Sequence, residues 1–530
     1  MSRLKRLAHS LLSGYILLGA NVFYTLASLP LALRYLDVPE FALWGLTSNI
    51  AQYIALVDAG MAGTARILVD YKDQKDGGAY GSVIQTFVLV SIVQGALILV
   101  LGIGLAFGLV PVLRIPAAQE REFVLLTIGQ CGLLMAGFLS RILNYLLGAH
   151  QRYDVVNYTQ AATFAVSFGA LWLGFRLRQG VYSTLWSQLA GWGVGVVGLG
   201  FWTLRLRLCP SRGCWGRPTW SRFRELFGYG RDVFLYAVGF QMLGASQTLV
   251  LTRGMGLEAS AVWTACTRTY VLVNQVVFKI FDFAAPAFAE MIVRGERELL
   301  FRRFRSMVVS SASLGVLVGA VFAVCNQPFV RLWTGGKFGW SPINDALLAG
   351  ALVLQAVTRC HLGLVGQAKQ FHSMRYLYMF EGAFFLCLAQ LVVPRGGITA
   401  MLAASVTATL LFSMPYGQWR SHRYFQVPWR TVAVQWWKSP LRLALGLAPL
   451  CGLAWWSGRL LPLRVQMLGS GAVVGLGGLA LMLRWGVDEG LVDELMGRVP
   501  GWSRPLLSAL RGRRAVPSEH ALPPTRTLSR

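Results

Sequence analysis

Runs of about 20 mainly apolar residues recur along this chain, and each is long enough to cross a bilayer as an α-helix. The second run includes the charged residue Asp58, and the eighth includes Arg268. The pattern predicts an all-α, polytopic membrane protein with about 14 transmembrane helices. The runs lie near residues 11–33, 40–60, 82–110, 123–147, 155–175, 181–204, 230–252, 258–280, 306–327, 343–366, 376–394, 397–416, 440–458 and 464–485.

The composition agrees with a membrane chain. Hydrophobic residues make up 55% of the sequence and charged residues only 14%, whereas a soluble chain carries about 25% charged residues. This excludes a soluble multidomain protein and a disordered chain. The formal net charge of +26 would suggest a nucleic-acid partner in a soluble protein, but basic loops also arise from membrane topology.

The basic residues predict the orientation. With the N-terminus in the cytoplasm, the cytoplasmic segments hold about three times as many Lys and Arg residues as the outside loops. Both termini are therefore predicted to be cytoplasmic, and the number of spans is predicted to be even. The positive charge is then accounted for by topology and anionic membrane lipids, and no nucleic-acid partner is expected.

An internal repeat defines the domain organisation. Arg141 and Gly148 in the fourth run match Arg359 and Gly366 in the tenth, 218 residues later. Because each copy holds six runs, we expect two parallel six-helix lobes related by an axis along the membrane normal, an arrangement that suits alternating access. The predicted parts are an N-lobe (1–204), a basic cytoplasmic linker (205–228), a C-lobe (229–416), a basic loop with an extra C-terminal hairpin (417–485) and a partly disordered cytoplasmic tail (486–530).

Three arginines are predicted to lie near mid-bilayer. Arg141, Arg268 and Arg359 each stand 10 or 11 residues before a basic residue at the cytoplasmic end of their run, which is roughly 15 Å along a helix. An arginine at that depth must face protein or a water-filled cavity. It either binds an anionic group, for which a carrier-lipid pyrophosphate is the best candidate, or it pairs with a nearby acid or caps a broken helix.

Small and polar residues share helix faces with these arginines. Gln355, Arg359, Gly363 and Gly366 share one face of the tenth run, and Arg268, Gln275 and Asp282 recur every seven residues in the eighth. We expect a cationic cavity that binds substrate, formed by Arg141, Arg268, Arg359, Asn21, Asn49, Gln52, Gln275 and Gln355. Asp58 and Asp282 are candidates for coupling to an ion, for neutralising an arginine or for an interfacial position.

Catalytic motifs are missing from the sequence. There is no Gly-x-x-x-x-Gly-Lys-Ser/Thr phosphate loop, no Gly-x-Ser-x-Gly elbow and no pair of histidines at metal spacing. The eight cysteines are scattered without a zinc pattern. We therefore expect no catalytic residue, no metal and no cofactor, and predict that the protein is not an enzyme.

The N-terminal region resembles polysaccharide-biosynthesis proteins, the O-antigen-type flippases of the multidrug/oligosaccharidyl-lipid/polysaccharide (MOP) exporter superfamily. The resemblance implies a transporter that moves undecaprenyl-pyrophosphate-linked oligosaccharide across the bacterial inner membrane, with glycan polymerase and glycosyltransferases as candidate partners. The segments that carry it are Ser13–Tyr15, Ala20–Val22, Leu29–Leu31, Phe41–Trp44 and Leu56–Met61.

The related lipid II flippases carry cavity arginines on their first, second and eighth helices. Here only the eighth-helix position has a matching arginine, Arg268, while the first two helices offer Asn21 and Asn49. This difference favours a carrier-linked glycan other than lipid II. The alternatives are a multidrug exporter of the same fold, which would need an acidic or aromatic cavity, and a membrane glycan polymerase or ligase, which would need an acid/base pair.

The predicted topology can be tested by labelling one introduced cysteine. Gly336 lies in the longest outside loop that the topology predicts, around residues 328–342. In a variant without the eight native cysteines, we expect a membrane-impermeant maleimide added to intact cells to label Gly336→Cys. Labelling only after the cytoplasmic face is opened would overturn the orientation.

Overall fold

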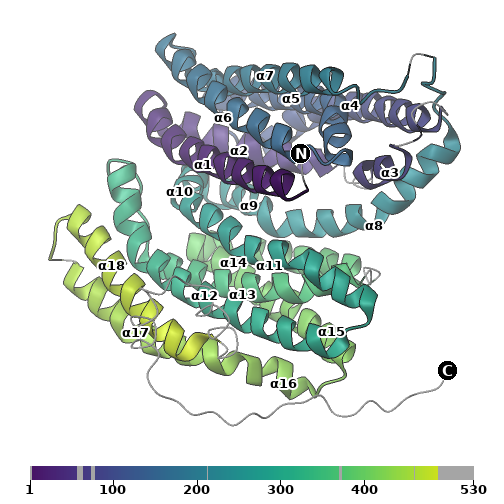
Figure 1. Ribbon diagram of the computed structural model, residues 1–530. Helices are drawn as coiled ribbons and strands as arrows, with labels where there is room; N and C mark the ends of the chain where they lie inside the picture. Colours follow the sequence, from purple (N-terminus) through teal and green to yellow (C-terminus); the bar gives the residue numbers. More distant parts are fainter. Residues whose placement is uncertain are drawn as a thin grey trace. The chain divides into compact units, whose positions relative to one another are not determined.

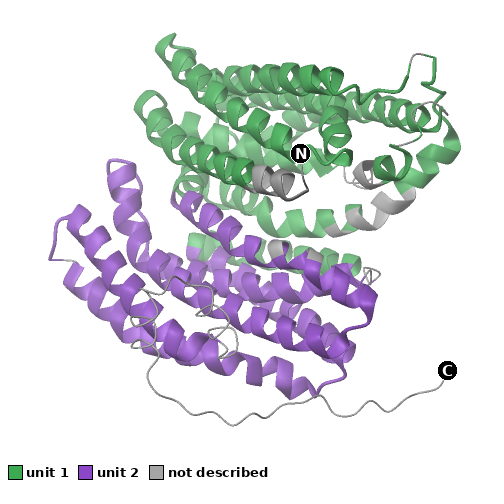
Figure 2. Cartoon of the chain, in the orientation of Figure 1, with its two compact units in different colours: residues 1–265, 375–398 green, residues 266–374, 399–530 purple. Residues whose placement is uncertain are grey.

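The computed structural model describes residues 3–56, 64–72, 74, 78–211, 213–368, 373–458 and 460–487, and every regular element in these ranges is a helix (Figure 1). The chain forms two compact units, which Figure 2 shows in different colours: unit 1 comprises residues 1–265 and 375–398, and unit 2 comprises residues 266–374 and 399–530. The lobes predicted from the repeat rest on sequence duplication and stay a prediction.

Unit 1 contains the N-terminal helices and the first part of α14. Its elements are α1 (Arg3–Tyr35), α2 (Val38–Ile54), α3 (Thr64–Tyr71), α4 (Ala79–Leu113), α5 (Ala117–Ala149), α6 (Tyr153–Arg176), the 3₁₀ turn η2 (Gly180–Tyr182), α7 (Ser183–Arg205), α8 (Trp220–Gly244), α9 (Ser246–Met255) and α10 (Leu257–Cys266), with α14 (Met374–Leu411) up to residue 398.

Unit 2 contains the remaining helices and the rest of α14. Its elements are α11 (Arg268–Arg294), α12 (Arg297–Trp333), α13 (Pro342–Gln367), α15 (Ser413–Phe425), α16 (Trp429–Ala433), the 3₁₀ turn η3 (Gln435–Trp437), α17 (Lys438–Gly458), α18 (Leu463–Leu481) and the π-helical turn η4 (Met482–Gly486).

The described parts of the predicted runs fall on these helices, and several runs are interrupted; the twelfth, for example, passes from α14 into α15 at Phe412. The seventh run is divided between α8 and α9 and the eighth between α10 and α11, while the eleventh and twelfth meet inside α14 at Gly397. Gly397 has φ 61° and ψ −147°, a conformation that side chains disfavour. Seven segments among the described residues are long and apolar enough to cross a membrane: Leu12–Tyr35, Ala79–Leu113, Ala117–Ala149, Arg297–Trp333, Pro342–Gln367, Met374–Phe425 and Leu463–Gly486.

Several helices expose large apolar side chains, as membrane helices do. On α4, Val93 is 61% exposed, Val100 68% and Phe107 59%. Water would penalise such a continuous apolar surface, whereas lipid tails would not. The exposed surface of α4 therefore fits a multi-pass membrane protein.

Local sequence fixes where individual helices begin. Asp37 and Glu40 form a capping box at the start of α2: Glu40 N donates to Asp37 Oδ1 at 2.7 Å, and Asp37 N donates to Glu40 Oε2 at 3.0 Å. Pro39 stands in the first turn, where a missing N–H costs nothing. These bonds satisfy backbone donors that have no partner inside the helix.

Each unit has its own apolar core. In unit 1, Tyr80, Phe87 and Leu226 are buried between α4, α5 and α8. In unit 2, Phe304 lies at the centre of an aromatic cluster with Phe425 and Trp436. The pair α17 and α18 packs on α12 through a second group of apolar side chains, which includes Leu443, Leu447 and Val474.

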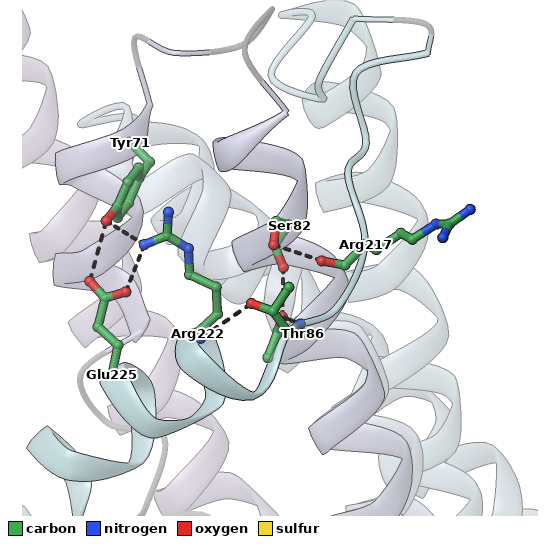
Figure 3. A network of polar contacts seen from close by, with 7 residues as sticks. Tyr71, Ser82, Thr86, Arg217, Arg222 and Glu225 are labelled. Carbon is green, nitrogen blue, oxygen red and sulfur yellow. Dashed lines mark hydrogen bonds and ion pairs between the residues drawn. The ribbon is translucent and has the colours of Figure 1, made fainter.

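The basic linker after α7 is fixed to the N-terminal end of α4 by side chains (Figure 3). Ser82 Oγ donates to Arg217 O at 2.7 Å, and Thr219 N donates to Thr86 Oγ1 at 3.3 Å. At the start of α8, Arg222 donates to Tyr71 and to Glu225. The last residues of the predicted linker are thus the first turns of α8, and the described linker residues on either side of position 212 belong to unit 1.

The contact between the linker and α4 predicts that alanine substitutions at two glycines of α4 change the stability of the protein by different amounts. A Cβ at Gly81 would overlap the backbone of Trp215 in the linker, whereas a Cβ at Gly104 has nothing within 4 Å. We expect Gly81→Ala to lower the free energy of unfolding by about 1–3 kcal/mol, because the linker backbone must move. Gly104→Ala is the matched control and should be neutral or slightly stabilising. Thermal stability in detergent measures both, and equal midpoints would contradict the docking.

Candidate functional site

Arg359 is paired with Asp282 across the interface between α13 and α11. Arg359 Nη2 donates to Asp282 Oδ1 at 2.6 Å, and Lys279 Nζ lies 3.9 Å from Asp282 Oδ2. The guanidinium also lies over the rings of Phe278 and Phe281, at 5.8 and 5.9 Å from their centroids. The side chains of the pair are 40% and 34% exposed. Of the interpretations open for Arg359, the structure has the arginine paired with a nearby acid.

Gln355 lies one turn before Arg359 and bridges the same two helices. Its Oε1 accepts hydrogen bonds from Asn274 Nδ2 at 2.6 Å and from Tyr270 Oη at 3.1 Å. Further along α13, Gly363 lets the ring of Phe281 pack against the backbone. The predicted polar face of this helix is therefore present, and it packs on residues of α11 that recur every four positions.

Arg268 and Arg359 lie at different levels along α11. Asp282, which holds the Arg359 guanidinium, is 14 residues after Arg268 on the same helix, and this corresponds to about 21 Å along the axis. The sequence predicted similar depths for both arginines. The packing of the two helices therefore decides the level at which Arg359 meets α11.

Arg268 is half-buried and is the first residue of α11, directly after the interruption at Thr267. The backbone there contacts a buried polar group that the sequence analysis missed. Asn326 Nδ2 donates to Cys266 O at 3.2 Å and to Asp345 Oδ1 at 2.7 Å. Both side chains are almost completely buried, with 2% exposure for Asn326 and 0% for Asp345.

The signal for this group was weak in the sequence. Asp345 stands in the first turn of the tenth run, where an acid is common for helix-dipole reasons, and Asn326 ends the ninth run without a motif. Trp340 Nε1 also donates to Asp345 Oδ1 at 2.7 Å. Only the packing of α12 against α13 brings these side chains together.

Arg141 belongs to unit 1 and has a different environment. Its Nη2 donates to Gln94 Oε1 of α4 at 3.0 Å. Its guanidinium lies over the rings of Phe138 and Phe87, at 4.3 and 5.0 Å from their centroids. An amide and two aromatic faces thus stabilise this cation. Arg141 lies in unit 1, and Arg268 and Arg359 lie in unit 2, so a cavity that all three line stays a prediction.

The amides of the predicted cavity differ in exposure. Asn49 Nδ2 donates to Gly45 O of its own helix at 2.8 Å. Gln52 on α2 and Gln275 on α11 are exposed, and Asn21 on α1 is half-buried. Their role in binding stays a prediction. Asp58, the other candidate for ion coupling, lies outside the described residues.

Comparison with known proteins gives matches in structure alone. No protein-family model matches the chain, and no curated protein matches it. Among solved structures, the lipid II flippase MurJ in an inward closed conformation has a TM-score of 0.65 and 11% identity, covering 88% of this chain and 98% of that chain. An inward-facing multidrug resistance MATE family transporter of the MOP superfamily has a TM-score of 0.61 and 15% identity, covering 76% and 95%.

A third similar structure is a MOP superfamily transporter from Pyrococcus furiosus, described as having a binding pocket of reverse polarity that suggests a different function. Its TM-score is 0.58 at 15% identity, and the match covers 80% of this chain and 97% of that chain. All three are described as transporters or flippases. This chain therefore has the all-α, multi-pass membrane fold of the MOP superfamily transporters.

Proposed function

We propose that this protein is a flippase that moves undecaprenyl-pyrophosphate-linked oligosaccharide across the bacterial inner membrane by alternating access. The observation that carries the proposal is Arg268, a half-buried arginine placed at a helix interruption within a predicted span. A guanidinium fork matches the oxygens of a pyrophosphate in two-point contact. Similarity to the lipid II flippase over most of both chains supports a lipid-linked substrate.

The two levels of arginine suit a stepwise passage. Because Asp282, the partner of Arg359, lies about 21 Å after Arg268 along α11, we expect the headgroup to contact the two arginines one after the other. An ion pair that is more than a third exposed adds little to stability, so Asp282 can release Arg359 at small cost when a phosphate replaces it. The same exchange would let Asp282 take part in ion coupling.

The proposal includes fourteen spans, both termini in the cytoplasm and two parallel lobes. The excess of basic residues in the predicted cytoplasmic segments supports the orientation. Glycosyltransferases and a glycan polymerase are the expected partners, because they would supply and consume a carrier-linked glycan. A carrier-linked glycan other than lipid II is favoured, because the first two helices offer Asn21 and Asn49.

A multidrug exporter is the second candidate, favoured by the structural similarity to the MATE family transporter. The Pyrococcus furiosus protein indicates that pocket polarity can differ within this fold. A binding site for cationic drugs needs acidic or aromatic side chains, and the carboxylate of Asp282 is already paired with Arg359. The charges in the described part of unit 2 therefore favour an anionic substrate.

A leaflet-resolved assay with purified protein in vesicles tests the proposed function. We expect Arg268→Ala to reduce flipping of a carrier-pyrophosphate glycan on the order of 10- to 100-fold, because a charge-assisted hydrogen bond is lost. Arg294→Ala is the matched control: it lies on the same helix, pairs with Glu290 and is exposed. Normal flipping by Arg268→Ala, or export of cationic dyes in place of the glycan, would contradict the proposal.

A substitution series at Arg359 tests the second level. We expect Arg359→Lys to keep part of the flipping rate, because a lysine retains the charge that pairs with Asp282. Arg359→Ala should lose more, because Asp282 then keeps only Lys279 as a cationic neighbour among the described residues. The same vesicle assay measures the rates at equal protein content. A rate for Arg359→Ala equal to that of the unmodified protein would exclude Arg359 from the path.

A further inference from the structure

A buried polar cluster in unit 2 lies next to the start of α11. Its centre is the side-chain amide of Asn326 on α12, which is 2% exposed. The amide nitrogen donates to Asp345 Oδ1 at 2.7 Å and to Cys266 O at 3.2 Å, and the amide oxygen accepts from Thr269 Oγ1 at 2.5 Å. One side chain therefore makes three hydrogen bonds without contact with solvent.

These bonds join both sides of the interruption that precedes Arg268. Cys266 is the last residue of α10, and Thr269 is the second residue of α11. Between them, Thr267 has φ −97° and ψ 0°, away from ideal helical values. An interrupted helix leaves carbonyls that need another donor, and Asn326 supplies one to Cys266 O. The chain on each side of Arg268 is thus bound to the same amide.

Asp345 determines which way this amide points. Asp345 Oδ1 accepts a hydrogen bond from Trp340 Nε1. The same oxygen is an acceptor for Asn326, so the NH₂ group of the Asn326 amide faces it and the amide oxygen points away. The oxygen is then left for Thr269. With Asp345 fully buried, water does not compete for these positions. Asp345 thereby gives the Asn326 amide one orientation.

We infer that Asn326, oriented by Asp345, is a positioning residue that holds Arg268 for contact with the anionic headgroup. The identity of the ligand rests on the proposed function, whereas the positioning of Arg268 does not. Asn326 itself does not bind the substrate. It holds the Cys266 carbonyl before Arg268 and the Thr269 hydroxyl after it, so that the guanidinium is presented from a fixed helix interruption.

The first test measures position 268 without any substrate. In a variant without the native cysteines, a spin label is attached to Arg268→Cys and its mobility is recorded by electron paramagnetic resonance. Asn326→Leu keeps the size of the side chain and removes all three bonds. Thr269→Val removes one of them and is the milder variant if Asn326→Leu does not fold. Both should increase the mobility of the label.

Thr399→Val is the matched control. Thr399 Oγ1 donates to Asn344 Oδ1 at 2.7 Å, and Asn344 is the neighbour of Asp345 in the first turn of α13. This substitution removes a hydrogen bond beside the cluster without changing Asn326, so it should leave label mobility unchanged. Unchanged mobility in both Asn326→Leu and Thr269→Val, or an equal increase in Thr399→Val, overturns the inference.

The second test measures transport in reconstituted vesicles. We expect Asn326→Leu to raise the half-saturating concentration of the carrier-pyrophosphate glycan about tenfold, and Thr269→Val to raise it by a smaller factor, whereas a merely structural role would lower the amount of folded protein without changing the half-saturating concentration. In the Arg268→Lys background Asn326→Leu should have a much smaller effect, because both changes act on one contact. Independent, additive effects overturn the inference.

The two tests separate failure of this inference from failure of the proposed function. If Arg268→Ala flips glycan normally, the proposed role of Arg268 is lost, and the spin label still decides whether Asn326 positions residue 268. If Arg268 is required but the label does not respond to Asn326→Leu or Thr269→Val, the proposed function stands and the positioning role is overturned.

Discussion

Backbone hydrogen bonding in an apolar surrounding governs this structure. An unpaired N–H or C=O group in hydrocarbon costs several kcal/mol, so a spanning chain folds into helices that satisfy their own backbone. Where a helix is interrupted, a side chain has to replace the missing bond. At the end of α10 the carbonyl of Cys266 receives this bond from Asn326. The interruption is therefore a defined feature with its own partners, and it places Arg268 at the start of a new helix.

The three arginines that the sequence predicts near mid-bilayer have three different environments. Arg141 uses an amide and two aromatic rings, Arg359 uses the carboxylate of Asp282, and Arg268 begins a helix beside a buried polar cluster. Burying a guanidinium is costly, and the contacts of Arg141 and Arg359 offset that cost in different ways. Asp282 balances the charge of Arg359 in this ion pair. In the proposed function, Arg359 can therefore bind an anion only when its ion pair with Asp282 opens.

Several site features could be predicted because they follow from spacing along one helix. The shared face of Gln355, Arg359 and Gly363 is a property of the helical repeat, and the structure has all three at the interface with α11. The pairing of Arg359 with Asp282 was open in the sequence, because an acid 77 residues away along the chain can reach it only through packing. Asn326 and Asp345 were missed because neither belongs to a motif and each stands near an end of its apolar run, where polar residues are common.

The sequence by itself determined the all-α class and the positions of most helices, because the length of an apolar run and the residues at its ends act locally. It also determined which residues share a helix face. Only the tertiary structure decided the partners of those faces. The register between α11 and α13 brings the Arg359 guanidinium to Asp282, which lies about 21 Å after Arg268 along α11. The packing of α12 on α13 joins Asn326 to Asp345. Such contacts depend on how helices distant in sequence slide and rotate against each other, and that information is absent from any single run.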